Sequence, residues 1–163
     1  MRTVRAVTIA LLALAPITAN AAGDPYTAID QMRSAFSHVQ SVQLVERFPS
    51  GSVATVQFSP SSAPRVATVG VSKNQLLLDY ATRPGGDLSS DVRDQFTVTE
   101  LGHKSLYGMM VDGYRLIDQS GAVETVWVSS KGLPVAMHVE AFGEAMDVLY
   151  GDYNNPTFFA TKP

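Results

Sequence analysis

The spacing of apolar residues changes once along the chain, from three or four residues near the start to two residues over most of the remainder. The first pattern consists of Ile29, Met32, Phe36 and Val39. This spacing predicts one amphipathic helix of about four turns, with Asp24 as its N-cap and Pro25 at its first position. The polar positions between the apolar ones, including Arg33, are expected to face water.

The period of two begins at Val42 and is interrupted at residues 49–51, a loop with glycine in third place. A three-residue loop of this kind closes an antiparallel hairpin. The resulting register places Leu44 opposite Val56 and Val42 opposite Phe58, so the apolar residues share one face of the hairpin.

The same loop signature returns at three later places, which are 11 residues apart: residues 119–121, 130–132 and 141–143. Even spacing of this kind predicts an up-and-down meander of antiparallel strands. Residues 97–118, which come before it, predict further strand with kinks at Gly102 and Gly108.

Two apolar runs between the hairpins, residues 65–71 and 75–82, predict two more strands joined by a turn at residues 72–74. The segment 87–96 predicts a short helix capped by Asp87. A meander of this length must protect its edges by closing into a barrel or by covering an open face. We therefore expect a mainly β (α+β) fold, in which a curved antiparallel meander forms an unclosed half-barrel with the N-terminal helix packed on its concave face.

The first 22 residues follow the order of a secretory signal peptide: two arginines, an uncharged run at residues 6–15, and small residues at 19–22. We expect cleavage after Ala21 or Ala22, with one domain at residues 22–163. The uncharged run is too short to cross a bilayer, and no later segment has the roughly 18 to 20 apolar residues of a membrane helix. These features predict a soluble protein that is secreted across the inner membrane into the periplasm.

The composition excludes several kinds of site. The chain has no cysteine, which excludes disulfides, thiolate metal sites and a lipid-bearing cysteine after the signal peptide. Its formal net charge of −3 disfavours nucleic acid as a partner. The sequence lacks a phosphate loop, a dinucleotide fingerprint, a zinc-protease motif and a serine elbow, so we expect no cofactor, no catalytic residue and no enzyme activity. A hydrolase would need Ser, His and Asp side chains that cluster in the fold.

His138 and Glu140 lie two residues apart in a predicted strand and therefore point to the same side. If the loop at residues 130–132 sets the register, Glu124 lies opposite His138, which gives a cross-strand pair on a solvated face. A metal shared by His138 and Glu140 would need a third ligand that the sequence does not offer. We therefore expect no metal site.

The same register places Val135, Met137 and Val139 on one face together with Trp127, which lies opposite Gly113. These residues either fill a core or line an apolar pocket, and flexible methionine side chains suit both roles. The candidate residues for binding an apolar ligand are Met32, Phe36, Leu44, Val56, Phe58, Trp127, Val135, Met137 and Val139.

A family resemblance rests on the apolar and glycine patterns of residues 28–48, 101–116, 123–139 and 152–163. In these segments the chain resembles the periplasmic lipoprotein-sorting carriers (LolA-like) and their LppX-like relatives, including the sensor domains of envelope-stress anti-sigma partners. The resemblance implies an unclosed barrel with a helical lid, an apolar cavity for acyl chains, and no catalysis. In the proteobacterial carrier, an arginine before the proline that ends the second strand holds the lid closed. Here Ser59 precedes Pro60, so this lid-locking residue does not transfer.

Two functions are consistent with these observations. The first is a soluble periplasmic lipid or lipoprotein carrier, which shields acyl chains in an apolar cavity between helix and sheet. The second is a non-enzymatic interaction or sensor module with an envelope protein as partner, or a structural domain without a ligand.

Overall fold

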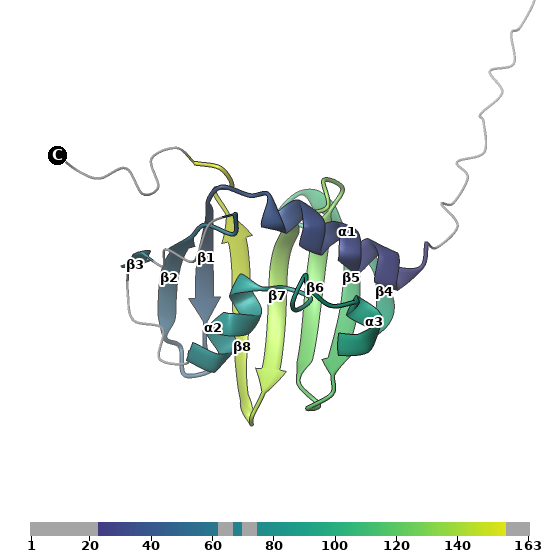
Figure 1. Ribbon diagram of the computed structural model, residues 1–163. Coiled ribbons are helices and arrows are strands. Elements are labelled where there is room, and N and C mark those ends of the chain that lie inside the picture. The colour runs from purple at the N-terminus through teal and green to yellow at the C-terminus, as the bar shows by residue number, and fades with distance from the viewer. Residues whose placement is uncertain (1–22, 62–66, 70–74, 156–163) are drawn as a thin grey trace, which may run out of the picture.

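The computed structural model describes residues 23–61, 67–69 and 75–155, which form three helices and one eight-stranded antiparallel sheet (Figure 1). The helices are α1 (Pro25–Ser37), α2 (Gln75–Thr82) and α3 (Val92–Gln95). The strands are β1 (Val42–Arg47), β2 (Val53–Phe58), β3 (Ala67–Val69), β4 (Phe96–Leu106), β5 (Met109–Asp118), β6 (Val123–Ser129), β7 (Pro134–Ala141) and β8 (Glu144–Gly151). The predicted signal peptide and the predicted turn at residues 72–74 lie outside the described residues.

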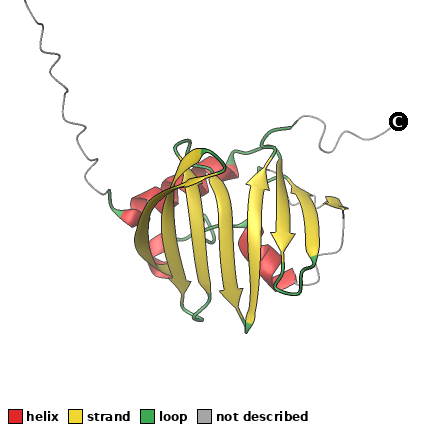
Figure 2. Cartoon of the chain, turned by 180° about the vertical axis from the view of Figure 1, so that it is seen from behind, coloured by secondary structure: helices red, strands yellow, loops and turns green. Residues whose placement is uncertain are grey.

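The strand order is β3-β2-β1-β8-β7-β6-β5-β4, so β3 and β4 form the two edges and the sheet stays open. All three helices lie on one face of this curved sheet, which we call the inner face; Figure 2 shows the opposite, outer face without a helix in front of it. The predicted mainly β, unclosed half-barrel with an N-terminal helix is thus confirmed.

Helix α1 begins where the sequence predicts. Asp24 caps it by accepting a hydrogen bond from the Tyr26 backbone N–H, and Pro25 occupies its first position. The predicted apolar stripe is fully buried. Arg33 differs from the prediction, because only 3% of its surface is exposed.

The first hairpin has the predicted register, with Leu44 opposite Val56 and Val42 opposite Phe58. All four side chains are buried on the inner face, within the core cluster. Alternation along β1 therefore separates a core face from a more exposed face, as expected for a strand whose one side packs under helices.

Residues 75–82 form helix α2, so the strand predicted there is wrong. Leu77, Leu78 and Ala81 are buried, and their one-, three- and four-residue separations match a helical stripe. A short apolar run does not distinguish a buried strand from a buried helix turn by its periodicity. Of the strand predicted at residues 65–71, the described part is β3, which pairs with β2.

The helix predicted within residues 87–96 is present but shorter. Helix α3 is capped by Asp91, whose side chain accepts from the Arg93 backbone N–H. Asp87, the predicted cap, instead accepts from the Ser89 backbone N–H in the preceding loop. Each aspartate precedes an apolar residue, but Val92 is buried whereas Leu88 is exposed, so the helix begins at Val92 and Asp91 is its cap.

The meander turns agree with the sequence at two of the three later loops. Residues 119–121 and 130–132 are three-residue loops, closed by backbone hydrogen bonds of 3.0 Å (Asp118 N–H to Ala122 C=O) and 2.9 Å (Ser129 N–H to Leu133 C=O). The third turn has only two residues, Phe142 and Gly143, both with positive φ, so that Ala141 pairs with Glu144. This pair of left-handed residues is typical of a tight hairpin turn.

Hairpin β6–β7 carries a bulge that the sequence did not reveal. Val128 pairs with Pro134, but the next pair is Trp127 with Ala136, so Val135 is an extra residue in β7. The bulge shifts the remaining register by one residue.

A one-residue shift exchanges the two faces of a strand, and two predictions are wrong for this reason. Glu124, expected opposite His138 on the solvated face, pairs with Val139 and is buried. Trp127, expected to share the face of Met137, lies on the outer face.

On the outer face Trp127 pairs with Gly113, as predicted. The ring lies so close to the glycine that a Cβ at position 113 would come within 2.3 Å of Trp127 Cζ3. Beyond a bulge between Glu100 and Gly102, the β4–β5 hairpin curls over this face (Figure 2), and the Lys104 ammonium lies 3.5 Å from the centre of the Trp127 ring. The kink predicted at Gly102 is therefore this bulge.

Candidate functional site

Most of the predicted ligand-binding residues meet in one cluster beneath the helices. They are Met32, Phe36, Leu44, Val56, Phe58, Met137 and Val139. The ring of Phe36 lies 6.0 Å from that of Phe58 and 5.8 Å from that of Tyr150, centre to centre, so aromatic contacts join α1 to β2 and β8. Each of the seven is at most 5% exposed, so in this conformation their side chains pack against one another.

The other two candidates lie elsewhere. Trp127 is on the outer face, and Val135 is buried at the bulge but does not belong to the inner-face cluster. Because of the bulge at Val135, Trp127 and Val135 do not share the inner face with Met137 and Val139.

Glu124 is a buried acid that sequence reasoning placed on the wrong face. It is 1% exposed, and its Oε2 accepts a hydrogen bond of 3.0 Å from the Gly85 backbone N–H. Its Oε1 has no hydrogen-bond partner among the described residues. Burial raises the pKa of Glu124 to about 8; repulsion from Asp118 adds to this, and the Gly85 hydrogen bond opposes it.

Glu124 lines a hollow of about 360 Å³ that opens between α2, the following loop and the β7–β8 turn. We call it the Glu124 hollow; its other lining residues are Asp79, Tyr80, Arg83, Gly86, Asp87, Gln95, Phe96 and Phe142. The Tyr80 hydroxyl is already engaged, since it donates a 3.0 Å hydrogen bond to Asp118. The hollow thus combines aromatic walls with a buried carboxyl.

The loop at residues 83–91 separates this hollow from α1. At Gly85 the backbone passes so close to α1 that an added Cβ would lie 3.0 to 3.2 Å from atoms of Ile29, Met32 and Arg33. Its φ of +76° is also one that glycine adopts most readily. Gly85 therefore lets the loop fit between the helix and Glu124.

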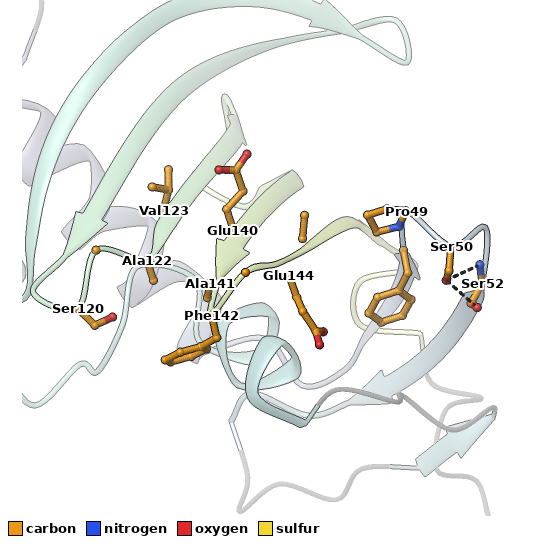
Figure 3. Close-up of a pocket in the computed structure, with 14 residues that line it drawn as sticks. Pro49, Ser50, Ser52, Ser120, Ala122, Val123, Glu140, Ala141, Phe142 and Glu144 are labelled. Atoms are coloured by element: carbon orange, nitrogen blue, oxygen red, sulfur yellow. Dashed lines mark hydrogen bonds between the residues drawn. The ribbon is translucent and has the colours of Figure 1, made fainter.

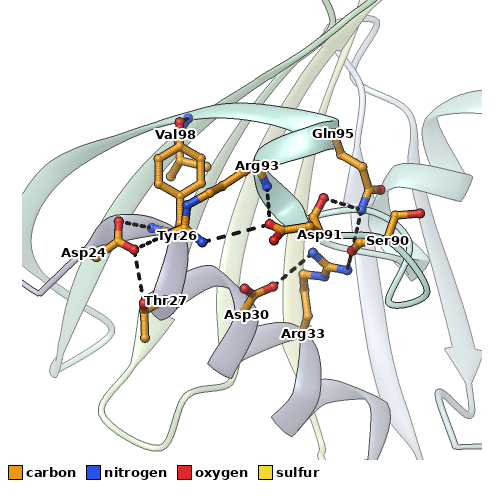
Figure 4. Close-up of polar contacts among 10 residues, drawn as sticks. All are labelled: Asp24, Tyr26, Thr27, Asp30, Arg33, Ser90, Asp91, Arg93, Gln95 and Val98. Atoms are coloured by element: carbon orange, nitrogen blue, oxygen red, sulfur yellow. Dashed lines mark hydrogen bonds and ion pairs between the residues drawn. The ribbon is translucent and has the colours of Figure 1, made fainter.

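Arg33 ties α1 to this loop, as Figure 4 shows in part. Its guanidinium donates to the backbone carbonyls of Asp87 and Ser90, the latter at 2.8 Å, and pairs with Asp30 at 3.1 Å. A second hollow, of about 150 Å³, lies beside it and is lined in part by Phe36. Buried charges persist where they are paired and hydrogen-bonded, so these contacts account for the burial of Arg33.

The start of α1 is held to α3 by a separate set of contacts (Figure 4). Arg93 forms an ion pair with Asp24, and its guanidinium lies 4.8 Å from the centre of the Tyr26 ring. Ion pairs between exposed side chains contribute little to stability. The polar contacts between α1 and α3 therefore contribute little to stability compared with the packing of the buried core.

At the turn end of the sheet lies a broad opening of about 900 Å³ (Figure 3). Val123 and Glu140 point to one side of it, whereas the Phe142 ring points to the other, toward the Glu124 hollow that it also lines. Ser50, Ser52 and Ser120 are in its lining, and no histidine is among the residues that line it.

On the outer face, His138 bridges two carboxylates: its Nδ1 is 2.7 Å from Asp147 and its Nε2 is 3.1 Å from Glu140. Burial opposes the charged ring, but the hydrogen bonds to Asp147 and Glu140 outweigh it and raise the pKa of His138. Within the described ranges, no group of three or more His, Cys, Asp or Glu side chains could hold a metal ion.

Comparisons by sequence give no relative: no protein-family model matches the chain, and no match is found among curated proteins. Solved structures do match. LppX, a lipoprotein of Mycobacterium tuberculosis, is 11% identical with a TM-score of 0.57, over 80% of this chain and 95% of that one. MucB is 14% identical with a TM-score of 0.51, over 80% of this chain and 58% of MucB. The chain therefore has the LppX-like fold that its sequence resembles. None of the helices among the described residues is long and apolar enough to span a membrane.

Proposed function

We propose that this protein is a soluble periplasmic lipid or lipoprotein carrier, which shields an acyl chain between its helices and the inner face of its sheet. The observation that carries the proposal is the composition of that face: one continuous apolar cluster runs from β2 to β6 beneath α1 and α2. The fold shared with LppX supports the same reading. The proposed activity is binding, without catalysis.

The energetics favour such a ligand. Each methylene removed from water contributes about 0.8 kcal/mol, so ten contribute about 8 kcal/mol before the cost of opening the protein. No charged anchor is needed for useful affinity.

Because the inner-face side chains now pack against one another, a chain would enter by moving the helices and the loop at residues 83–91 away from the sheet. Met32, Met137 and Met146 are fully or almost fully buried there, and their flexible side chains can repack around a ligand. The hollows on either side of the loop mark where the packing is already incomplete.

The test is equilibrium binding of a fluorescent fatty acid to the purified secreted protein. Phe36→Leu alters the inner face and should weaken binding at least threefold. Tyr107→Leu is the matched control, because Tyr107 is 69% exposed at the tip of the β4–β5 hairpin, and it should leave affinity unchanged. No binding by the folded wild-type protein, or equal effects of both variants, would contradict the proposal.

A kinetic variant tests the entry route. Arg33→Met removes the bonds from α1 to the Asp87 and Ser90 carbonyls and should speed probe uptake severalfold in stopped-flow measurements. An unchanged uptake rate would show that the loop does not gate entry.

A second candidate function, an interaction module for an envelope protein, has its own supporting observation. Tyr107, Met109 and Met110 are exposed together at the tip of the β4–β5 hairpin, where apolar side chains face solvent. If this tip binds a partner, Met110→Asp should abolish native co-purification of one stable partner. Val53→Asp, which changes an exposed apolar residue away from this tip, should retain the partner.

A further inference from the structure

The Glu124 hollow contains a feature that shielding of an alkyl chain alone does not use. An alkyl chain needs only apolar walls, yet the inner end of this hollow holds a carboxyl that is 1% exposed and has one oxygen without a partner among the described residues. Leaving a buried polar atom unbonded costs free energy, so such atoms are rare unless a ligand, ion or water completes them. The arrangement indicates a ligand with a polar atom that can form a hydrogen bond with Glu124.

The charges around Glu124 limit what that atom can be. Asp118 lies close enough to raise the pKa of Glu124, and no basic group contributes to the shift. The phenols of Tyr80 and Tyr150 are the other titratable groups that interact with it, and both have a raised pKa, chiefly from burial. Of the basic side chains near the hollow, Arg33 is bonded to loop carbonyls and Asp30.

The mouth of the hollow is also acidic. Asp79 and Asp87 line it together with one cation, Arg83, which lies 4.0 Å from Asp79. A free carboxylate entering here would meet like charge and would find no buried cation to pair with. At neutral pH Glu124 itself is protonated, because its pKa is about 8, so it has a hydrogen to donate.

We propose that the Glu124 hollow binds the ester or amide carbonyl of an acylated ligand, with the Glu124 carboxylic acid donating a hydrogen bond to the carbonyl oxygen. The adjoining alkyl chain contacts Tyr80, Phe96 and Phe142. This assignment rests on the proposed lipid-binding function and narrows it, because it selects acyl esters and amides over free fatty acids.

The dimensions and mouth of the hollow fit this ligand. Its volume of about 360 Å³ lies within the range of about 300 to 1,000 Å³ typical of small-molecule sites. At the mouth, Phe142 is 67% exposed and has a left-handed backbone with φ of 56°. The tight turn that holds Phe142 in this conformation also brings its ring into the lining of the hollow, where it would cover the bound chain.

The test compares three probes that share a ten-carbon chain: methyl decanoate, decanoate and decylamine. Titration calorimetry on the purified secreted protein at pH 7 should show the methyl ester binding at least tenfold more tightly than the other two. Glu124→Leu should weaken ester binding about tenfold, the equivalent of about 1.4 kcal/mol. Glu124→Gln, which keeps an N–H donor, should stay within about threefold of wild type.

The pH dependence of ester binding distinguishes the contribution of the Glu124 proton from that of the shape of the hollow. Only the protonated Glu124 can donate a hydrogen bond to the ester carbonyl. Wild-type affinity for the ester should therefore fall about tenfold between pH 7 and pH 9. Glu124→Gln should show no such fall. Phe142→Ala, at the exposed mouth, should weaken ester binding severalfold at both pH values.

Each alternative outcome has a distinct meaning. Tighter binding of decanoate, or decylamine binding that strengthens toward pH 9, would overturn the carbonyl assignment and leave the lipid-binding function standing. Equal ester affinities for wild type and a folded Glu124→Leu variant would do the same. Failure of the folded wild type to bind any of the three probes or the fluorescent fatty acid would overturn both proposals.

Discussion

The inner face of the sheet carries aliphatic and aromatic side chains under three helices, whereas the outer face carries charged groups around a single tryptophan. The outer apolar centre is small, and the curled β4–β5 hairpin already shields it: Lys104 lies over the Trp127 ring, and an adjacent groove measures about 240 Å³. The inner face offers a continuous apolar surface and two buried acids, Glu46 and Glu124. The inner face is therefore where we propose that an apolar ligand binds, with a polar contact at Glu124.

The largest expected effect concerns Glu124 and pH. The folded protein holds this proton up to about pH 8, whereas the unfolded chain releases it near pH 4.5. The free energy of unfolding should therefore fall as pH rises, by about 3.5 kcal/mol from this group between pH 5 and pH 8. Urea unfolding at pH 5 and pH 8 measures this change.

Glu124→Gln removes the titration, so its stability should depend much less on pH than that of the wild type, and it should be the more stable protein at pH 8. The exposed Glu100 gives the control, because Glu100→Gln should leave the pH dependence as it is. A wild type equally stable at pH 5 and pH 8 would mean that Glu124 is ionised or solvated when folded.

Neighbouring residues of β1 test the difference between the faces directly. Leu44 is fully buried on the inner face, and Val45 points outward. Leu44→Ala should lower the free energy of unfolding by about 3 kcal/mol, while Val45→Ala should lower it by about 1 kcal/mol or less. Equal losses in chemical denaturation would show that both faces are packed alike.

The contact between Trp127 and Gly113 provides a test of the outer face. Gly113→Ala should cost about 2 kcal/mol, because its Cβ would overlap the indole ring. In a Trp127→Ala background the same substitution should cost little. A double-mutant cycle by thermal unfolding measures this coupling, and additive effects would place the ring elsewhere.

The smallest effect is expected at His138. His138→Ala should change stability by less than about 1 kcal/mol, since its carboxylate partners are exposed. With a raised pKa in the folded state, the stabilisation is present below about pH 6.5 and is lost as pH rises through the folded value. A metal-dependent increase in melting temperature that His138→Ala abolishes would contradict the structural role.

Much of this architecture could be predicted from residue patterns. The helix cap at Asp24, the β1–β2 register and the glycine-closed loops depend on local chemistry, which the sequence contains directly. The unclosed half-barrel was predicted from the order of these elements, whereas the LppX-like fold was implied by the family resemblance.

The faces of β6 and β7 could not be predicted in this way. The loop at residues 130–132 is the expected one, but the bulge at Val135 follows it without a glycine to mark it. A proline at position 134 was the only local sign, since proline is tolerated at the start of a strand or at bulges. The position of Glu124 depends on that single inserted residue, so a buried acid was taken for a surface one.

Helix α2 was missed for a related reason. Its burial comes from contacts with β7 and β8, far away in the sequence, and not from a local signal. Tyr150 illustrates this, because its hydroxyl donates to the Ala81 carbonyl at the end of α2. Sequence periodicity alone cannot report such contacts.

The central claim, that an acyl chain occupies the space between the helices and the inner face, is tested most directly by the contents of the protein itself. Native mass spectrometry of the protein, purified without detergent, should show an added mass that organic extraction releases as an acylated lipid. A folded protein of bare polypeptide mass, which also takes up no lipid when incubated with an extract of its own cell envelope, would contradict the account.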